Sequence, residues 1–368
     1  MQIPDFTLER YFAKWEFAVR HVLCASDVEP VTLAELLALA DDETRERWDT
    51  LRLGYTESLG LPDLRAEIAR LYTGLSADDV ITFAGAEEGV FIAMNVLVGP
   101  GDHAVVVWPS YQSLHEVARA TGGSVTLVPL DRRDWSLDVD AVAAAMRPNT
   151  RVIVVNSPHS PTGAQLAPGQ LARLVAIAEL HGVYLFSDEV YRFLEHDAPA
   201  LQPAAEQTPR GISLGVMSKA FGLAGLRVGW IATRDTRLRS RLASFKDYTT
   251  ICNGAPNELL ALIALRARPE LLRRTREIVS RNLSALDAFF ARNAERFAWA
   301  RPRAASVGFP ELLHGDVDDF AARLVEREGV LILPASQFGY PGNHFRLGFG
   351  RRDMPEALAK LERFSAEG

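Results

Sequence analysis

Short runs of β-branched and aliphatic residues recur through the middle of the chain, with segments of helical spacing between several of them. The runs read VITFA, HAVVVWP, SVTLVPL, RVIVVNS, VYLFSDE, ISLGVM and LRVGWIA. The helical segments cover 87–97, 111–121, 138–146 and 167–181. Such alternation is typical of a mostly parallel sheet buried on both faces. The loop before LRVGWIA is too short for a crossover helix, so one strand of the last pair is expected to run antiparallel.

The pattern changes after about residue 255. Long charged amphipathic helices come first, followed by the strands VLILPAS and HFRLGFG and a final helix. We therefore predict an α/β protein with a large domain over 46–254. A smaller α+β domain is expected to combine 1–45 with 255–368.

The composition and net charge limit the classes of protein to which this chain can belong. The 368 residues are 48% hydrophobic and 24% charged with a net charge of −7, which is typical of a soluble globular protein and gives no basic footprint for nucleic acid. Two cysteines, Cys24 and Cys252, cannot build a disulfide framework. The sequence contains no uncharged apolar run of about 18 residues, so it predicts no membrane span. It also shows no secretory signal. We expect a cytoplasmic protein without a membrane or metal site.

Lys219 stands between the apolar run ISLGVM and a string of glycines. It is either a surface charge at a strand end or a buried amine kept for chemistry. Asp188 ends another apolar strand, at the sheet edge where open α/β sheets bind ligands, although a helix N-cap is the alternative.

Two further motifs are ambiguous alone. In GAEEG, Gly85 and Ala86 introduce a helix whose first amides could bind an anion, or form an ordinary turn. In FRLGFG, Arg346 shares a strand face with Gly348 and Gly350, which would leave space for a ligand carboxylate to meet the guanidinium. An exposed arginine on an edge strand is the alternative.

The order of these motifs is more specific than any one of them. LGYTESLGLPDLR, GAEEG, WPSYQSL, SPHSPTG, SDEVY, SKAFGLAGLRVGW and FRLGFG together resemble the fold-type I pyridoxal-phosphate enzymes, specifically the class I and II aminotransferases. The resemblance covers nearly the whole chain. It implies a three-layer fold with a mostly parallel central sheet flanked by helices, and pyridoxal 5'-phosphate as cofactor.

The resemblance also implies roles for the residues around the cofactor ring. Lys219 would be the catalytic residue, binding the cofactor aldehyde through its amine and later carrying the α-proton. Asp188 would pair with the ring nitrogen, Tyr191 would bond the phenolic oxygen, and Tyr111 would stack on the ring face. Ser160 stands where the family usually has asparagine, which would leave the bond to the phenolic oxygen lost, water-bridged or left to Tyr191.

By the same resemblance, the cofactor phosphate would lie on the turn at Gly85 and on the amides of Ala86 and Glu87. Ser218 and Arg227 would add a hydroxyl and a charge. Val216 replaces a family hydroxyl residue that often helps to hold the phosphate.

Tyr55 is similar to the tyrosine that reaches the neighbouring subunit's phosphate, which implies a homodimer with shared active sites. Arg346 would clamp the substrate α-carboxylate.

The expected reaction moves an amino group from an L-amino acid to a 2-oxo acid by a ping-pong mechanism. The alternative is cyclisation, elimination or oxidation of a basic amino acid such as an arginine derivative, because parts of the sequence resemble capreomycidine synthases. Two loops, 23–30 and 245–258, offer groups that would line an acidic substrate site or serve only as caps and turns. These are Ser26, Asp27, Glu29, Asp247 and Tyr248. A regulator's effector domain and a scaffold without cofactor are less favoured.

Overall fold

Seven strands form the central sheet of the computed structural model, which describes residues 2–367. They are β1 Val80–Phe83, β2 His103–Trp108, β3 Ser124–Pro129, β4 Thr150–Asn156, β5 Tyr184–Asp188, β6 Gly211–Val216 and β7 Gly229–Ala232. Their order across the sheet is β1-β7-β6-β5-β4-β2-β3. Only β7 runs against its neighbours, which confirms the antiparallel strand expected from the short β6–β7 loop.

Both faces of the sheet are buried, because alternate residues of each strand point to opposite sides. In β2, Ala104 and Val106 join one apolar cluster, and Val105 and Val107 join another. The first cluster contains α5 Ala86–Leu97, α6 Ser113–Ala120 and α10 Thr236–Lys246, and the second contains α7 Val139–Ala144 and α8 Pro168–His181. The predicted three-layer fold is therefore confirmed.

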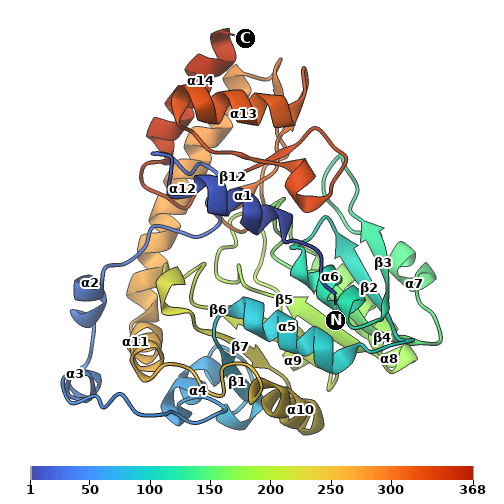
Figure 1. Ribbon diagram of the computed structural model, residues 1–368, viewed down its shortest axis with the longest axis vertical. Coiled ribbons are helices and arrows are strands. Elements are labelled where there is room, and N and C mark those ends of the chain that lie inside the picture. The colour runs from blue at the N-terminus through green and yellow to red at the C-terminus, as the bar shows by residue number, and fades with distance from the viewer. Residues whose placement is uncertain (1, 368) are drawn as a thin grey trace.

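The remaining elements lie at the sheet's ends and beyond. The helices are α1 Thr7–Trp15, α2 Leu33–Leu37, α3 Asp42–Asp49, α4 Pro62–Ala69, α9 Ala204–Gln207, α11 Ala255–Arg266, α12 Arg268–Arg292, α13 Val317–Glu328 and α14 Met354–Glu367. Short 3₁₀ turns are η1 Ala77–Asp79, η2 Ala224–Leu226 and η3 Ala335–Phe338. Figure 1 shows the long α12 running from α11, beside the sheet, toward α13 and α14 at the other end.

Two small sheets accompany these helices. β10 Glu311–Leu312 pairs with β8 Phe297–Ala298, and β12 Phe345–Gly348 lies between β11 Leu333–Pro334 and β9 Val307–Gly308. The expected strands at 330–336 and 344–350 are present but shorter than predicted. The domain limits 46–254, 1–45 and 255–368 stay a prediction. Among residues 2–367, no helix combines the length and apolar composition that crossing a bilayer requires.

Candidate active site

A cavity of about 320 Å³ lies at the carboxyl ends of β4, β5 and β6. Its other walls come from α1, from β12 and from the segment that joins α1 to α2. Most of the predicted site residues line it: Ser26, Ala86, Glu87, Tyr111, Ser160, Asp188, Tyr191, Ser218, Lys219, Arg227 and Arg346. Gly85 and Tyr55 are not among the lining residues; Gly85 lies against Arg227, which lines the cavity, and Tyr55 is 93% exposed. The volume is within the range of small-molecule sites.

Asp188 is the last residue of β5 and is only 6% exposed. Its Oδ1 accepts a hydrogen bond from the Val190 amide at 3.2 Å. Burial raises the pKa of the Asp188 carboxyl to about 7, and the nearby Lys219 opposes this increase. No described helix begins at this residue, so the N-cap alternative is wrong.

Lys219 lies three residues beyond the end of β6 and is half-buried. Its Nζ donates a hydrogen bond to Ser26 Oγ at 2.8 Å and lies 5.4 Å from the centre of the Tyr191 ring. The Tyr191 hydroxyl donates to the Ser26 carbonyl at 3.1 Å. The lysine is therefore directed into the cavity and is not a free surface charge.

The first turn of α5 forms one end of the cavity. Gly85 precedes the helix with φ +89°, and a side chain there would place its Cβ 2.5 Å from Arg227 Nη2. Glycine thus allows the guanidinium to lie against the helix N-terminus, where the amides of Ala86 and Glu87 need partners. Together with Ser218, these groups form a cradle suited to an anion.

The side chain of Glu87 has a role that the sequence interpretation missed. Its carboxylate accepts a hydrogen bond from Ser113 Oγ at 2.9 Å. Burial raises the pKa of Glu87 to about 7, and the neighbouring Glu9 and Asp188 add to the increase. The only signal in the sequence was a glutamate in the first turn of a helix, which is usually exposed.

Hydrogen bonds hold the Tyr111 side chain and the backbone at Ser160 in place. The Tyr111 hydroxyl donates to Glu9 Oε1 at 2.8 Å, which ties the cavity wall to α1. The Ser160 amide donates to Asn156 Oδ1 at 2.6 Å, and Asn156 Nδ2 donates to the Asp188 carbonyl at 2.9 Å. Asn156 was not predicted, although a polar residue at the carboxyl end of an apolar strand could have indicated it.

Arg346 is 2% exposed, so the alternative of an exposed edge-strand arginine is wrong. Its Nε and Nη2 donate to the Cys24 carbonyl at 3.2 and 3.0 Å. The expected role of the two glycines also needs correction. A Cβ at Gly348 would overlap the Ala25 carbonyl oxygen, and one at Gly350 would lie 2.6 Å from the Asp27 carbonyl oxygen. Backbone 25–27, rather than open space for a ligand, occupies that face of the strand.

Acidic side chains line the wall formed by α1 and the segment after it. Glu9 and Glu16 come from the α1 region, and Asp27 forms an ion pair with Arg351 at 2.8 Å. Burial, followed by the charges of Asp27 and Glu9, raises the pKa of Glu16.

The other residues expected on the substrate side lie outside the cavity lining. Glu29 accepts from the Arg352 amide, Asp247 accepts from Ser58, and Tyr248 is 90% exposed.

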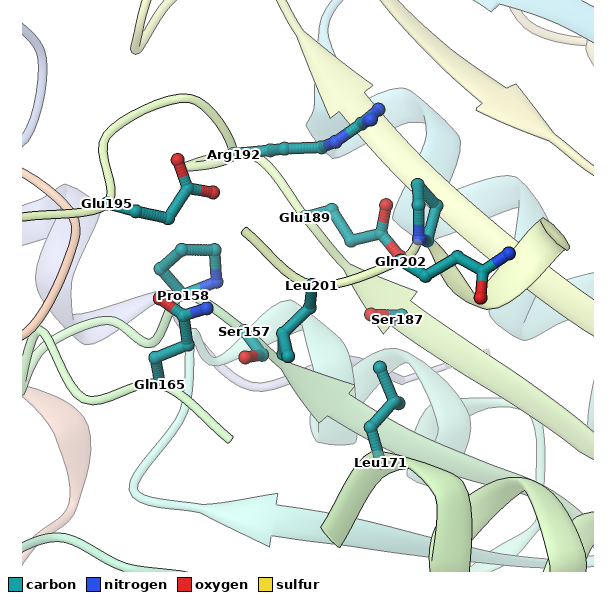
Figure 2. A pocket seen from close by; sticks show the side chains of 11 residues that line it. Ser157, Pro158, Gln165, Leu171, Ser187, Glu189, Arg192, Glu195, Leu201 and Gln202 are labelled. Atoms are coloured by element: carbon teal, nitrogen blue, oxygen red, sulfur yellow. The ribbon is translucent and has the colours of Figure 1, made fainter. Parts of the chain in front are cut away.

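A second pocket lies near Asp188 but is far smaller, with a volume of about 20 Å³. Figure 2 shows Ser187, Glu189 and Leu171 around this hollow. Glu189 Oε1 accepts from the Ala204 amide at 2.9 Å and from Ser213 Oγ at 2.8 Å. The volume suits about one water molecule, so the pocket is too small for a coenzyme.

Comparison with known proteins agrees with this geometry. Residues 32–361 match the model of the family described as aminotransferase class I and II. The capreomycidine synthase of Streptomyces vinaceus is 33% identical over 98% of this chain and 93% of its own. A PLP-dependent aminotransferase from Streptococcus suis 89-1591 superposes with a TM-score of 0.94 at 29% identity, covering 100% of this chain and 99% of that one. The PLP-dependent cyclase OrfR gives 0.91 at 29% identity, covering 100% and 98%.

The extent of these matches bears directly on the sequence prediction. They span β5 with Asp188, the segment after β6 with Lys219, and the C-terminal region that carries Arg346. The predicted family, an enzyme family that depends on pyridoxal phosphate, is confirmed. This chain belongs to the class I and II aminotransferases.

Proposed function

We propose that this chain transfers the amino group of an L-amino acid to a 2-oxo acid, using pyridoxal 5'-phosphate in a ping-pong mechanism. One observation carries the proposal: Lys219 and Asp188 line the same cavity, and an anion cradle lies at its end. The amine, the carboxyl and the cradle match the aldehyde, the ring nitrogen and the phosphate of the cofactor. When bound, the cofactor supplies an aldehyde and a ring that accepts electrons.

The residues of the chain would divide the remaining work. Lys219 would hold the cofactor and move the α-proton, and Arg346 would bind the substrate carboxylate through its planar donors. Asp188 would be ionised once a cationic ring nitrogen lies beside it, since an opposite charge lowers a carboxyl pKa.

The cradle formed by Ala86, Glu87, Ser218 and Arg227 would hold the phosphate, with the turn at Gly85 allowing its close packing. Three residues would surround the cofactor ring, namely Tyr111, Tyr191 and Ser160.

The test is a panel of amino donors added to the reconstituted protein, scored by spectral conversion of the cofactor to its aminated form. Activity should require a 2-oxo acid for turnover. Lys219→Ala should abolish it, whereas the exposed lysine variant Lys14→Ala should retain it. A protein that binds no cofactor, or a Lys219→Ala variant that turns over normally, would refute the proposal.

The acidic wall favours a second candidate, a cofactor-dependent reaction on a basic amino acid. Glu9, Glu16 and Asp27 place three carboxylates beside the cavity, and Arg351 neutralises one of them. A cationic substrate side chain would be attracted there, and a second substrate carboxylate would be repelled.

The donor panel separates the two candidates. Turnover of arginine without any 2-oxo acid would indicate cyclisation or oxidation, and dependence on the oxo acid would indicate transamination. Glu16→Gln should raise the KM for arginine by about tenfold, the effect of one weakened charged contact. The exposed Glu179→Gln is the matched control and should leave that KM unchanged.

We also propose that two copies of the chain share their active sites. The loop that contains Thr56 lies beside the loop that contains Asn253, because Thr56 Oγ1 donates a hydrogen bond to the Asn253 carbonyl at 2.9 Å. They carry large exposed apolar side chains, namely Leu53, Tyr55, Tyr248 and Ile251. A second copy would cover this surface and receive Tyr55 at its phosphate cradle.

Subunit mixing tests this arrangement. A mixture of Lys219→Ala and Tyr55→Ala chains should regain activity, because one site of each mixed dimer has both side chains. A monomer in light scattering would contradict the dimer. The cytoplasmic location stays a prediction.

A further inference from the structure

Ser26 lies against Lys219 although 193 positions separate the two residues. Its Oγ accepts a hydrogen bond from Lys219 Nζ at 2.8 Å. Within residues 2–367, this hydroxyl is the one hydrogen-bond acceptor of Nζ, and no carboxylate forms an ion pair with that amine. The direction of the lysine amine is therefore set by a neutral side chain from the N-terminal segment.

The fold delivers Ser26 to this place through its backbone. The segment that carries it lies along the small sheet, where the Cys24 amide donates to the Leu331 carbonyl at 3.0 Å and the Glu29 amide donates to the Gly350 carbonyl at 2.8 Å. Gly348 admits the segment, because any larger residue would overlap the Ala25 carbonyl. Close approach of one backbone to another is a common reason for glycine.

Two hydroxyls then fix Ser26 itself. Its carbonyl accepts hydrogen bonds from Tyr191 Oη and from Ser306 Oγ, each at 3.1 Å. With the carbonyl held from two sides, the Cα–Cβ bond has a defined direction and Oγ faces the lysine. A contact supported in this way is built by several elements and does not depend on one flexible side chain.

We propose that Ser26 is a positioning residue that holds the ε-amine of Lys219 for proton transfer at the substrate α-carbon. This inference rests on the proposed function. Nζ takes the α-proton as a base and becomes an ammonium, while the electron pair of the broken C–H bond stays with the bound substrate and cofactor. Nζ later returns that proton. Ser26 Oγ can accept one N–H in both protonation states, so the remaining part of the amine stays directed at the substrate.

The test uses Ser26→Ala and the conservative Ser26→Thr in the full-length protein. Ser26→Ala should lower kcat by about 10- to 100-fold relative to wild type, which is the effect of losing one hydrogen bond to a charged group. Comparing the α-deuterated with the ordinary amino donor should also give a larger deuterium isotope effect on kcat in Ser26→Ala than in wild type. Ser26→Thr should restore kcat to within about threefold of wild type, because it keeps the hydroxyl. Cofactor affinity should stay within about threefold in both variants, since Ser26 holds the amine and not the phosphate cradle.

A second readout needs no cofactor. Trace acylation of the cofactor-free protein, followed by mass spectrometry, compares the reactivity of Lys219 with that of exposed Lys14 in the same sample. Without its acceptor the amine is released, so Ser26→Ala should label Lys219 about three- to tenfold faster, whereas Ser26→Thr should match wild type.

Equal labelling in all three proteins, or an unchanged isotope effect in Ser26→Ala, would overturn the inference. A wild type inactive with every donor would instead refute the proposed function, and the labelling result would still report on the contact.

Discussion

Replacing Asp188 by asparagine should stabilise the cofactor-free protein at neutral pH and disable the loaded enzyme. The pKa of Asp188 rises from 3.8 to about 7 because the folded chain buries it. The folded state therefore holds the proton more tightly than the unfolded state. The stability that this proton contributes is fully present below pH 4 and is lost as the pH rises through 7.

The size of the effect follows from the size of the shift. A shift of about three units, at 1.36 kcal/mol each, costs the folded state about 4 kcal/mol once the carboxyl is ionised. Part of this cost is already present at pH 5, so about 2.5 kcal/mol is added between pH 5 and pH 8. Asparagine cannot ionise, and its Oδ1 can still accept from the Val190 amide. The stability difference between the variant and wild type should therefore grow by that amount over this range.

Urea unfolding of both cofactor-free proteins at pH 5, 6, 7 and 8 measures this difference directly, and effects of other groups cancel in the subtraction. The exposed Asp42→Asn is the control and should give a difference independent of pH. With cofactor present, Asp188→Asn should lower kcat at least about 100-fold, because the ring nitrogen loses its charged partner. Parallel pH profiles for Asp188→Asn and wild type would refute the reasoning about burial.

Three more predictions address other parts of the site. Gly348→Ala should lower the free energy of unfolding by at least about 2 kcal/mol, because its Cβ would overlap the Ala25 carbonyl, whereas Gly169→Ala, with open space around it, should be neutral or stabilising in urea unfolding. Glu87→Gln should bind the cofactor on the order of tenfold more tightly at pH 8.5 and equally at pH 6, since a carboxyl with a pKa of about 7 repels phosphate only when ionised; fluorescence titration at both pH values tests this. Arg346→Gln should raise the KM for the amino donor about 100-fold in steady-state kinetics, and an unchanged KM would contradict the proposed carboxylate clamp.

The sequence predicted the parts of the molecule that local patterns determine. The seven apolar runs became the seven strands of the sheet, and the short loop before β7 indicated its reversed direction. Two-residue strands such as β8 Phe297–Ala298 could not be predicted, because a pairing partner elsewhere in the chain defines them.

Within the site, the sequence located the residues at strand ends better than those brought in by packing. Asp188 and Lys219 follow apolar runs, so their place at the sheet edge was readable. The carboxylates of Glu9 and Glu16 were missed, because an amphipathic helix does not reveal which cavity it will cover. At Gly348 the pattern indicated open space for a ligand carboxylate, but it could not show that the backbone at Ala25 fills that space.

The docking of residues 24–27 against β12 has a consequence for how the protein is made. Cys24 and Arg346 are 322 positions apart, so residues 24–27 are synthesised long before β12 and cannot dock until β12 has been made. The central sheet can be complete by then, with Lys219 already in place and nothing to orient it. Assembly of the catalytic centre would thus be a late event, and a nascent or C-terminally shortened chain could be well folded in its sheet yet inert.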